Sequence, residues 1–593
     1  MRSALHMTSK TPDTSQDTSQ LHADRIYRGG PILTMNDAQP QVEALAIRGK
    51  RILAVGTWEE LQGLVGRDTE VVDLAGRTLM PGFIDAHGHI MGWILYWGTP
   101  DLAPPPAGTI QTIPDIAEAL RNYIQEKAIP EGTLVLASGY DDSLLEERRH
   151  PIREELDAVS SKHPICIVHT SAHLAVFNSM LLDRVGYVGE DSAPEGGIIQ
   201  VDKNGRPTGV VEEEAVNAFH ALLPQEPDLP GLLKTLKEVQ QRYASLGITT
   251  VEDGITGKSS VDLLMLAASL RVLFLDVLLF PKWTEANAID AIPHLPREGY
   301  VGHLKVGGVK ITQDGSPQGK TAFLEKPYFK PPPDKDSTYR GKPILSQADL
   351  DMEVDKAFEK GRQLHIHCNG DAAADMMLTS IARATEKFGP ADRRPVMVHA
   401  QTVREDQLDQ MKALGIIPTF FVAHTFYWGD WHRDETLGRE RAERISPLRS
   451  TTNRDMLYTI HNDSPVVPPD IMPLVWSAVA RTTRSEQELG PEQRATPLEA
   501  LKAVTAWAAY QNFEEREKGT LEPDKLADLV VLSGNPLTAP TEALRDLYVV
   551  ETVKGGTTVY LRDPEIPTAA GRSLSSHTRG APFLAFLPRH TCC

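Results

Sequence analysis

His87 and His89 are the first residues along the chain whose types and spacing suit metal chemistry. They close an apolar run that begins near Met80, and the Pro-Gly at its start is typical of a short buried strand. Alternate side chains of a strand point to the same side, so both imidazoles are expected to face one point. Imidazole nitrogen is a preferred ligand of zinc and similar ions. Two hydrogen-bonded loop histidines would have the same spacing, so a metal site requires further ligands elsewhere.

Four later apolar runs carry further metal-compatible or titratable residues near their ends. These residues are Lys310, His367, His399 and Asp463. Each has an ordinary explanation by itself: strand-end lysines are commonly exposed, buried histidines are commonly satisfied by hydrogen bonds, and aspartate before Ser-Pro can form a turn. Their matching positions at strand ends favour one common site instead.

Eight strand-like runs position these residues, and most are separated by segments in which apolar residues have helical spacing. Eight repeats of this kind, with continuous apolar strands, predict an α/β protein with a parallel (β/α)8 TIM barrel. The active site of such a barrel lies at the carboxyl ends of the strands. The runs are 82–89, 247–254, 271–280, 306–315, 362–371, 395–401, 415–424 and 455–463.

The segments outside this repeat predict the domain organisation. Residues 1–22 are polar and predicted to be disordered, and 563–593 form a C-terminal tail. Short β-rich runs in 23–80 and 495–562 predict a β-sandwich domain built from both chain ends. The barrel occupies 81–494, and its residues 93–230 are predicted to be an insertion between the first and second barrel strands.

Composition restricts the partners and the compartment. The formal charge of −19 over 593 residues argues against nucleic acid and anionic membranes as partners. We find neither an apolar run long enough for a transmembrane helix nor a secretory signal, and the cysteines have no framework spacing. We therefore expect a cytoplasmic protein, with a homo-oligomer (dimer or tetramer) as the usual state of such enzymes. The cysteines are Cys166, Cys368, Cys592 and Cys593.

Several segments resemble, in the same order, motifs of the metal-dependent amidohydrolase superfamily. They are MPGFIDAHGHI, VKITQDGSPQGKTA, HIHCNGDAAAD, VHAQ and HNDSPV. The chain is most similar to the branch known as amidohydrolase family 3, which contains N-substituted formamide deformylase. Further matching segments are SAHLAVFNS, PTGVVEEEA, GITTVEDG and residues 427–450, so the resemblance extends over roughly residues 25–560.

The resemblance implies a binuclear site that usually holds two Zn²⁺ ions, with another divalent metal as the alternative. The implied ligands are His87, His89, Lys310, His367, His399 and Asp463. The first two histidines and Asp463 would bind one ion, and the two later histidines would bind the other. Lys310, carboxylated on its amine by carbon dioxide, would bridge the ions, because a carbamate is an anionic oxygen donor whereas an ammonium group cannot bind metal.

The implied chemistry is hydrolysis of a carbon–nitrogen bond. Two nearby dications lower the pKa of a shared water and polarise the substrate carbonyl. Asp463 would take the proton of the attacking water and pass it to the leaving nitrogen, as general base and then general acid. An amide needs this step, because an unprotonated amine does not leave a tetrahedral intermediate.

Aromatic residues near the predicted mouth of the barrel are candidates for substrate contacts. They are Trp93 and Trp97 after the first run, and Phe421 and Trp428 after the seventh. Ordinary packing explains such residues equally well, whereas the functional interpretation is a mostly apolar pocket. The resemblance adds His173, within SAHLAVFNS, as a further substrate contact. The hypothesis is hydrolysis of an N-substituted amide or formamide, a small molecule with a bulky hydrophobic or aryl group.

Other interpretations stay open. The same site could hydrolyse or deaminate a cyclic amide or amidine, or hydrolyse an ester or carbamate. A non-catalytic regulator on this scaffold would be expected to lack ligands, whereas all six positions are filled.

Neighbouring residues leave alternatives at the ligand positions. His365 faces the same way as His367 and could replace it as a ligand, whereas Cys368 is predicted to be core because it points to the other face. His169 and His461 are predicted to be structural.

Overall fold

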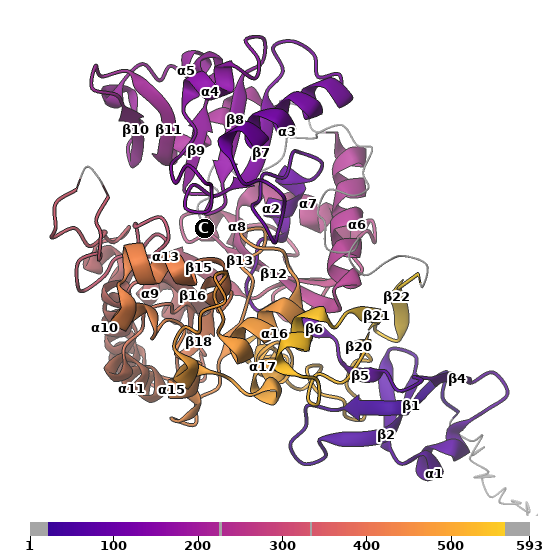
Figure 1. Cartoon of the computed structure of the whole chain (residues 1–593). Coiled ribbons are helices and arrows are strands. Elements are labelled where there is room, and N and C mark those ends of the chain that lie inside the picture. The colour runs from indigo at the N-terminus through magenta and orange to yellow at the C-terminus, as the bar shows by residue number, and fades with distance from the viewer. Residues whose placement is uncertain (1–21, 224–227, 333–334, 564–593) are drawn as a thin grey trace, which may run out of the picture.

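The computed structural model describes residues 22–223, 228–332 and 335–563. The segments 1–21 and 564–593, which hold almost all of the predicted disordered segment and tail, lie outside the described residues. The described chain has three parts: a sheet built from both chain ends, a central set of parallel strands with their helices, and an insertion that lies over one end of those strands (Figure 1).

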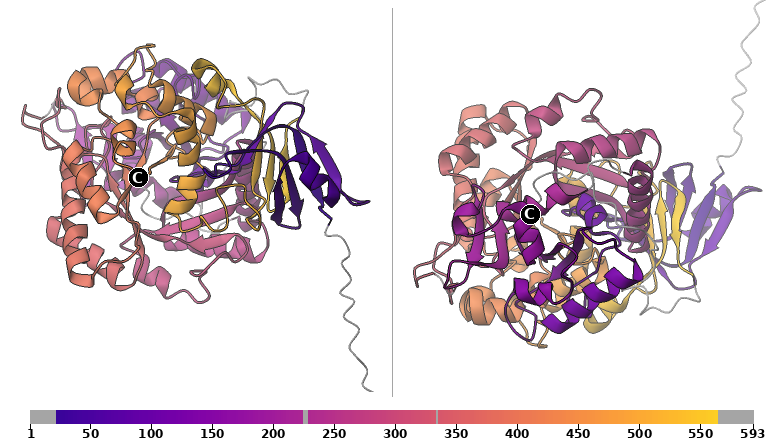
Figure 2. Two further views of the ribbon diagram at one scale, coloured as in Figure 1. Left: turned by 90° about the horizontal axis from the view of Figure 1, so that it is seen from below. Right: turned by 90° about the horizontal axis from the view of Figure 1, so that it is seen from above.

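Strands from both chain ends form one sheet of eight strands within the described residues. Its order is β22-β21-β20-β5-β1-β2-β3, and β4 pairs with β1. The antiparallel pair β5 (Thr78–Pro81) and β20 (Leu529–Leu532) joins the two ends, which lie side by side in Figure 2. The two-layer packing of a sandwich stays a prediction. The other strands are β1 (Arg25–Leu33), β2 (Gln41–Arg48), β3 (Arg51–Gly56), β4 (Glu70–Asp73), β21 (Val549–Lys554) and β22 (Thr557–Leu561).

The central strands form two parallel sheets, with four and five strands in the part of the chain that the structure describes. Their orders are β14-β13-β12-β6 and β15-β16-β17-β18-β19, and a parallel bridge from Lys282 to Lys310 links β13 to β15. This is the strand order predicted for the barrel, although no strand pairing among the described residues closes β19 onto β6. The strands are β6 (Phe83–Ile84), β12 (Ile248–Thr256), β13 (Asp276–Pro281), β14 (Leu304–Val306), β15 (Gly308–Thr312), β16 (Gln363–Cys368), β17 (Val396–His399), β18 (Ile417–Phe420) and β19 (Thr459–Ile460).

The strand predicted at 306–315 is wrong in its extent, because the chain divides at Gly307. Val306 pairs with β13, whereas Gly308 begins β15 and pairs with β16. Gly307 packs so closely on Phe280 that an added Cβ would lie 2.6 Å from the Cζ atom of the ring. A side chain is therefore excluded at the point where the chain passes from one sheet to the other.

The strand predicted at 271–280 begins only at Asp276. The backbone N–H groups of Phe274 and Leu275 donate to the side-chain oxygen of Gln240, which takes the place of a neighbouring strand. The first and last barrel strands are also shorter than predicted, because residues 85–89 and 461–463 leave the sheets to form the ends that carry candidate ligands.

Helices on the outside of the central strands bury their apolar faces in one large core (Figure 2). Residues 495–513 form two helices, α17 (Pro497–Ala503) and α18 (Ala506–Gln511), which are divided because Thr505 has the non-helical angles φ −139° and ψ −94°. Across the described ranges, no helix has the length and apolarity needed to cross a bilayer. The main outer helices are α6 (Leu229–Ser245), α7 (Lys258–Ser269), α9 (Gln347–Glu359), α10 (Asp371–Phe388), α11 (Glu405–Leu414) and α16 (Ile471–Ala480).

The insertion between β6 and β12 contains its own sheet of five described strands, in the order β10-β11-β9-β8-β7. Cys166 and Val168 of β8 pack into one core, whereas Ile165 and Ile167 pack into another, so both faces of the sheet are buried. The strands are β7 (Val135–Tyr140), β8 (Ile165–His169), β9 (Leu174–Phe177), β10 (Gly197–Val201) and β11 (Pro207–Glu213), and the helices include α2 (Ile90–Tyr96), α3 (Ile113–Glu126), α4 (Arg153–Asp157) and α5 (Ser179–Val185).

Hydrogen bonds tie the insertion to the loops that follow the barrel strands, and two of them reach the turns after β7 and β8. Thr170 Oγ1 donates to the backbone oxygen of Val466 at 2.9 Å, and Trp428 Nε1 donates to Asp141 Oδ2 at 2.6 Å. The turn after β8 is therefore held directly beside the carboxyl ends of the central strands.

Candidate metal centre

Three histidines surround Asp463, which follows β19. Asp463 Oδ1 lies 3.5 Å from His87 Nε2 and 3.1 Å from His89 Nε2. Asp463 Oδ2 lies 4.0 Å from His399 Nε2. The facing atoms of His87, His399 and Asp463 all lie within 4.8 Å of one another. Residues from the first, sixth and eighth barrel strands therefore meet at one buried point.

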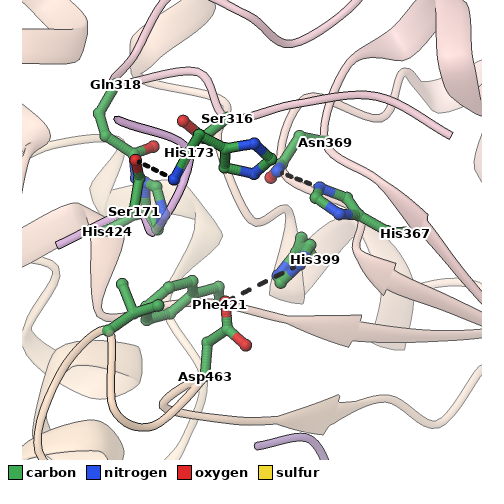
Figure 3. Close-up of a pocket in the computed structure, with 11 residues that line it drawn as sticks. Ser171, His173, Ser316, Gln318, His367, Asn369, His399, Phe421, His424 and Asp463 are labelled. Carbon is green, nitrogen blue, oxygen red and sulfur yellow. Dashed lines mark hydrogen bonds and ion pairs between the residues drawn. The ribbon is translucent and has the colours of Figure 1, made fainter. Parts of the chain in front are cut away.

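Lys310 and His367 extend this group to the fourth and fifth barrel strands. Lys310 is 1% exposed, and its Nζ donates to His87 Nε2 at 2.9 Å. The rings of His367 and His399 have centroids 4.4 Å apart, and Figure 3 shows His399 between His367 and Asp463. The six predicted ligands are thus brought together in space, although their assignment as ligands stays a prediction.

The protonation states of this group suit metal binding. Burial lowers the pKa of His87, His367 and His399 well below the usual value, and the positive charge of Lys310 adds to this effect. Burial alone would raise the pKa of Asp463, but the hydrogen bond from His89 and nearby positive charges lower it to about 2. Neutral imidazoles and an ionised carboxylate are the forms that bind a divalent ion, so these donors are suited to binding a divalent metal.

Two of these residues have a strained backbone conformation. His399 has φ +72° and Asp463 has φ +51°, a region that residues with a side chain rarely occupy. Strain of this kind costs free energy and collects where a side chain must be aimed at a site. His461, predicted to be structural, helps to orient the ring of His399, because its Nε2 lies 3.1 Å from Nδ1 of His399.

Glu252 is a buried carboxylate that the sequence interpretation missed. Its Oε2 lies 3.9 Å from His87 Nδ1 and 3.7 Å from His365 Nδ1, and burial raises its pKa well above the usual value. His365 also stacks on Phe280 with ring centroids 3.7 Å apart. His365, the alternative to His367, therefore faces Glu252 on the other side of His87 from Asp463. The signal available in the sequence was an acidic pair inside the apolar run 247–254.

A cavity of about 20 Å³, enough for one water, lies beside the candidate ligands. Of the described residues that line it, Phe421 and Val466 are apolar and the others are polar or charged, so the mostly apolar substrate pocket stays a prediction. The insertion contributes Ser171 and His173. The remaining lining residues are Ser316, Gln318, His367, Asn369, His399, His424 and Asp463.

The predicted substrate contacts fall into two groups. His173 and Phe421 line the cavity, and His173 Nδ1 lies 3.0 Å from Glu213 Oε2. Trp93, Trp97 and Trp428 are not among the lining residues. Their indole N–H groups donate to Ser464, to Glu238 at 3.0 Å and to Asp141 at 2.6 Å. These three indoles anchor neighbouring segments. A role in substrate contact stays a prediction for the three tryptophans as well as for His173 and Phe421.

His424 is a cavity-lining residue that the sequence interpretation missed, although the sequence pattern could have identified it. It ends the predicted run 415–424, so the rule that identified the other strand-end residues also applies to it. Ser316 and Gln318 lie in the long segment between β15 and α9, where no periodic pattern fixes their position. Cys368 packs against α10, with its Sγ 3.9 Å from Met377 Sδ.

Comparisons with known proteins agree with this geometry. The model of the amidohydrolase family matches residues 70–560. N-substituted formamide deformylase from Arthrobacter pascens is 28% identical over 91% of this chain and 98% of its own length. Putative amidohydrolase YtcJ from Bacillus subtilis (strain 168) is 27% identical over 90% of this chain and 99% of its own.

A solved structure, described as an uncharacterized metal-dependent hydrolase from Pyrococcus horikoshii OT3, has the same fold. Its TM-score is 0.69 at 23% identity, and the match covers 87% of this chain and 99% of that one. The family model spans the strand ends that carry the clustered histidines and, from the sheet made from the chain ends, the strands β4, β5, β20 and β21. The chain therefore belongs to the amidohydrolase family.

Proposed function

We propose that the chain hydrolyses the carbon–nitrogen bond of an N-substituted amide, with formamides that carry a bulky hydrophobic or aryl group on nitrogen as the preferred class. The observation that carries this proposal is the meeting of His87, His89 and Asp463 at one buried point, where Asp463 also lines a cavity. Membership of the amidohydrolase family supports a metal-dependent hydrolase, and the formamide deformylase relative supports the amide as substrate.

The six clustered side chains would hold two divalent ions, which we assign as zinc. When bound, the ions polarise the amide carbonyl and make water a nucleophile near neutral pH. His87, His89 and Asp463 would hold one ion, and the two later histidines would hold the other. An unmodified Lys310 ammonium would repel both cations, whereas its carbamate would bind them, so we propose that Lys310 is carboxylated.

Asp463 is the residue that moves the proton. Its low pKa keeps it ionised at neutral pH, and it lines the cavity where the amide would lie. It would therefore accept the proton of the attacking water and deliver it to the leaving nitrogen. His89 Nε2 lies 3.1 Å from Asp463 Oδ1, so the carboxylate is placed beside the histidines proposed to hold the same ion.

The cavity favours a small acyl group. A void of about 20 Å³ with polar walls suits a formyl group better than a long acyl chain. Phe421 and Val466 provide the apolar side on which a hydrophobic nitrogen substituent would pack. A substituent of that size requires the insertion or the loop after β18 to move outward.

Assay of the zinc-loaded protein tests this function. Matched formamides and acetamides with aryl and alkyl nitrogen substituents would be compared, with formate or acetate and the free amine measured as products. We expect turnover of formamides and a loss of at least about 10²-fold in Asp463→Asn. Cyclic amides, amidines, esters and carbamates belong in the same panel, and release of ammonia would identify a deaminase instead. Absence of turnover for every amide in metal-replete protein removes the proposal.

A further inference from the structure

His424 presents one ring nitrogen to the cavity. It is 1% exposed, and its Nδ1 lies 2.9 Å from His432 Nε2. The rings of Phe421 and Trp428 hold its imidazole, with centroids 4.5 Å and 4.6 Å away. Because Nδ1 is engaged by His432, Nε2 is the nitrogen on the cavity side of the ring (Figure 3).

The hydrogen bonds continue behind His424 to a buried hydroxyl group. His432 Nδ1 lies 2.9 Å from Thr436 Oγ1, and both residues are fully buried. The two residues are the ends of a π-helical turn, which is closed by the bond from Leu437 N–H to His432 O at 2.9 Å. Such turns are rare and recur at functional sites.

The hydroxyl group of Thr436 sets the direction of this chain of hydrogen bonds. Burial lowers the pKa of His424 well below its usual value and that of His432 to about 3, so each ring is neutral and carries one proton. Within the described residues, His432 Nδ1 is the single acceptor in reach of the Thr436 hydroxyl. If His432 donated instead, the hydroxyl hydrogen would be buried without an acceptor, which is unfavourable.

The direction fixes the tautomer of both rings. Thr436 donates to His432 Nδ1, so His432 carries its proton on Nε2 and donates to His424 Nδ1. His424 must then carry its own proton on Nε2, which faces the cavity. A protonated Nε2 cannot act as a general base, but it can donate a hydrogen bond.

We propose that Thr436 and His432 hold His424 as a neutral Nε2–H donor, which binds the acyl oxygen of the substrate as negative charge develops on it. Donors placed in advance around such an oxygen stabilise the transition state more than the bound substrate. The contact with the acyl oxygen rests on the proposed amide hydrolysis, whereas the tautomer does not. His432 and Thr436 are positioning residues in this arrangement.

Neutron diffraction of the zinc-loaded protein tests the tautomer without any substrate. Deuterium is expected on Nε2 of both His424 and His432, and deuterium on Nδ1 of His424 overturns the proposal. If the map shows the expected tautomer but no amide is hydrolysed, the proposed function fails and the assigned donor direction stands.

Kinetics with the formamide that has the highest kcat/KM test the role. His424→Phe is expected to lower kcat about 10²-fold, and Thr436→Val about 10-fold with little change in KM. Thr436→Ser, which restores the hydroxyl, should recover most of that loss. Thr425→Val is the matched control, because the buried Oγ1 of Thr425 has no hydrogen-bond partner among the described residues. Zinc content and melting temperature are measured for each variant. A wild-type kcat in Thr436→Val overturns the positioning role.

Discussion

Lys310 is the residue whose state decides how many ions the site holds. Its amine is buried among imidazoles and touches His87 Nε2 at 2.9 Å. Four neutral histidines and one carboxylate supply too little negative charge to neutralise two dications. A carbamate on Lys310 would add a second anionic ligand. We therefore expect the second ion to bind only when Lys310 is carboxylated.

Lys310→Ala tests this dependence. We expect bound zinc to fall from two ions to one or fewer, and kcat to fall about 10³-fold, because the several kcal/mol that metal polarisation supplies would be lost. Elemental analysis and the formamide assay measure the two effects. Lys282→Ala is a suitable control, since Lys282 is also buried and its backbone pairs with that of Lys310 in a parallel β-bridge. Two ions per chain in Lys310→Ala would show that Lys310 is no ligand.

The candidate ligands could be predicted from the sequence, but the cavity wall could not. Three candidate ligands, Lys310, His367 and His399, lie in strands, where period-two alternation and apolar runs fix position and direction. The other three directly follow the apolar runs of the first and last barrel strands, which fix their position. Ser316 and Asn369 lie beyond the strands, where loop geometry places them. Trp93 and Trp428 were expected at the mouth because they are aromatic, yet their N–H groups find buried partners and draw the rings away from the cavity lining.

The local sequence pattern predicts where the barrel strands lie, but tertiary packing decides where some of them begin and end. Apolar runs predicted the eight positions of the barrel strands, but the break at Gly307 depends on its contact with Phe280, which is 27 residues earlier and invisible to periodicity. In the same way, the start of β13 depends on the amide of Gln240 in α6. Element ends set by distant side chains therefore escape sequence reasoning.

One buried ion network fixes β13 to the sheet from the chain ends. Asp276 accepts from Lys518 Nζ at 2.5 Å and from Lys554 Nζ at 2.6 Å. His303 Nδ1 lies 2.8 Å from the same carboxylate. Burial would raise the pKa of Asp276, but the two ammonium groups hold it well below its usual value. A lowered pKa stabilises the fold above the unfolded-state pKa of about 4, and this contribution is lost as pH falls toward the folded-state value.

Asp276→Asn should therefore destabilise the protein strongly at neutral pH and weakly in acid. We expect a loss of up to about 3–5 kcal/mol at pH 7, because two buried ammonium groups lose a shared counter-ion, although Lys554 keeps Asp528 and Lys518 keeps Glu514. Melting temperatures from about pH 7 down to about pH 3 measure the difference from wild type, which should shrink below about pH 4. Asp262→Asn, which removes an exposed pair with Lys258, should cost less than about 1 kcal/mol throughout. A difference that does not change with pH would contradict the assignment.

The whole molecule closes its site with two parts of the chain that have separate hydrophobic cores. The barrel strands carry the candidate ligands, and the insertion brings Ser171 and His173 to the opposite wall of the cavity. The cavity holds about one water, so the bulky substrate proposed above would have to separate these parts to bind. The bond from Trp428 to Asp141 is one of the ties that such an opening has to release or carry along.

Trp428→Phe tests whether this tie controls access. The ring is kept, but Asp141 Oδ2 loses its donor, at a cost of about 1–3 kcal/mol when the carboxylate is buried. We expect hydrogen exchange in the turn after β7, which holds Asp141, to become roughly 10-fold to 100-fold faster, because local opening becomes easier. We also expect KM for formamides to change more than zinc content or melting temperature. Trp476→Phe removes an indole from the barrel side, where its ring packs on Phe426 at a 5.2 Å centroid distance, and should leave exchange in that turn unchanged. Equal exchange in the two variants would mean that the insertion is held by its apolar packing, and that the tie from Trp428 orders only the loop that carries it.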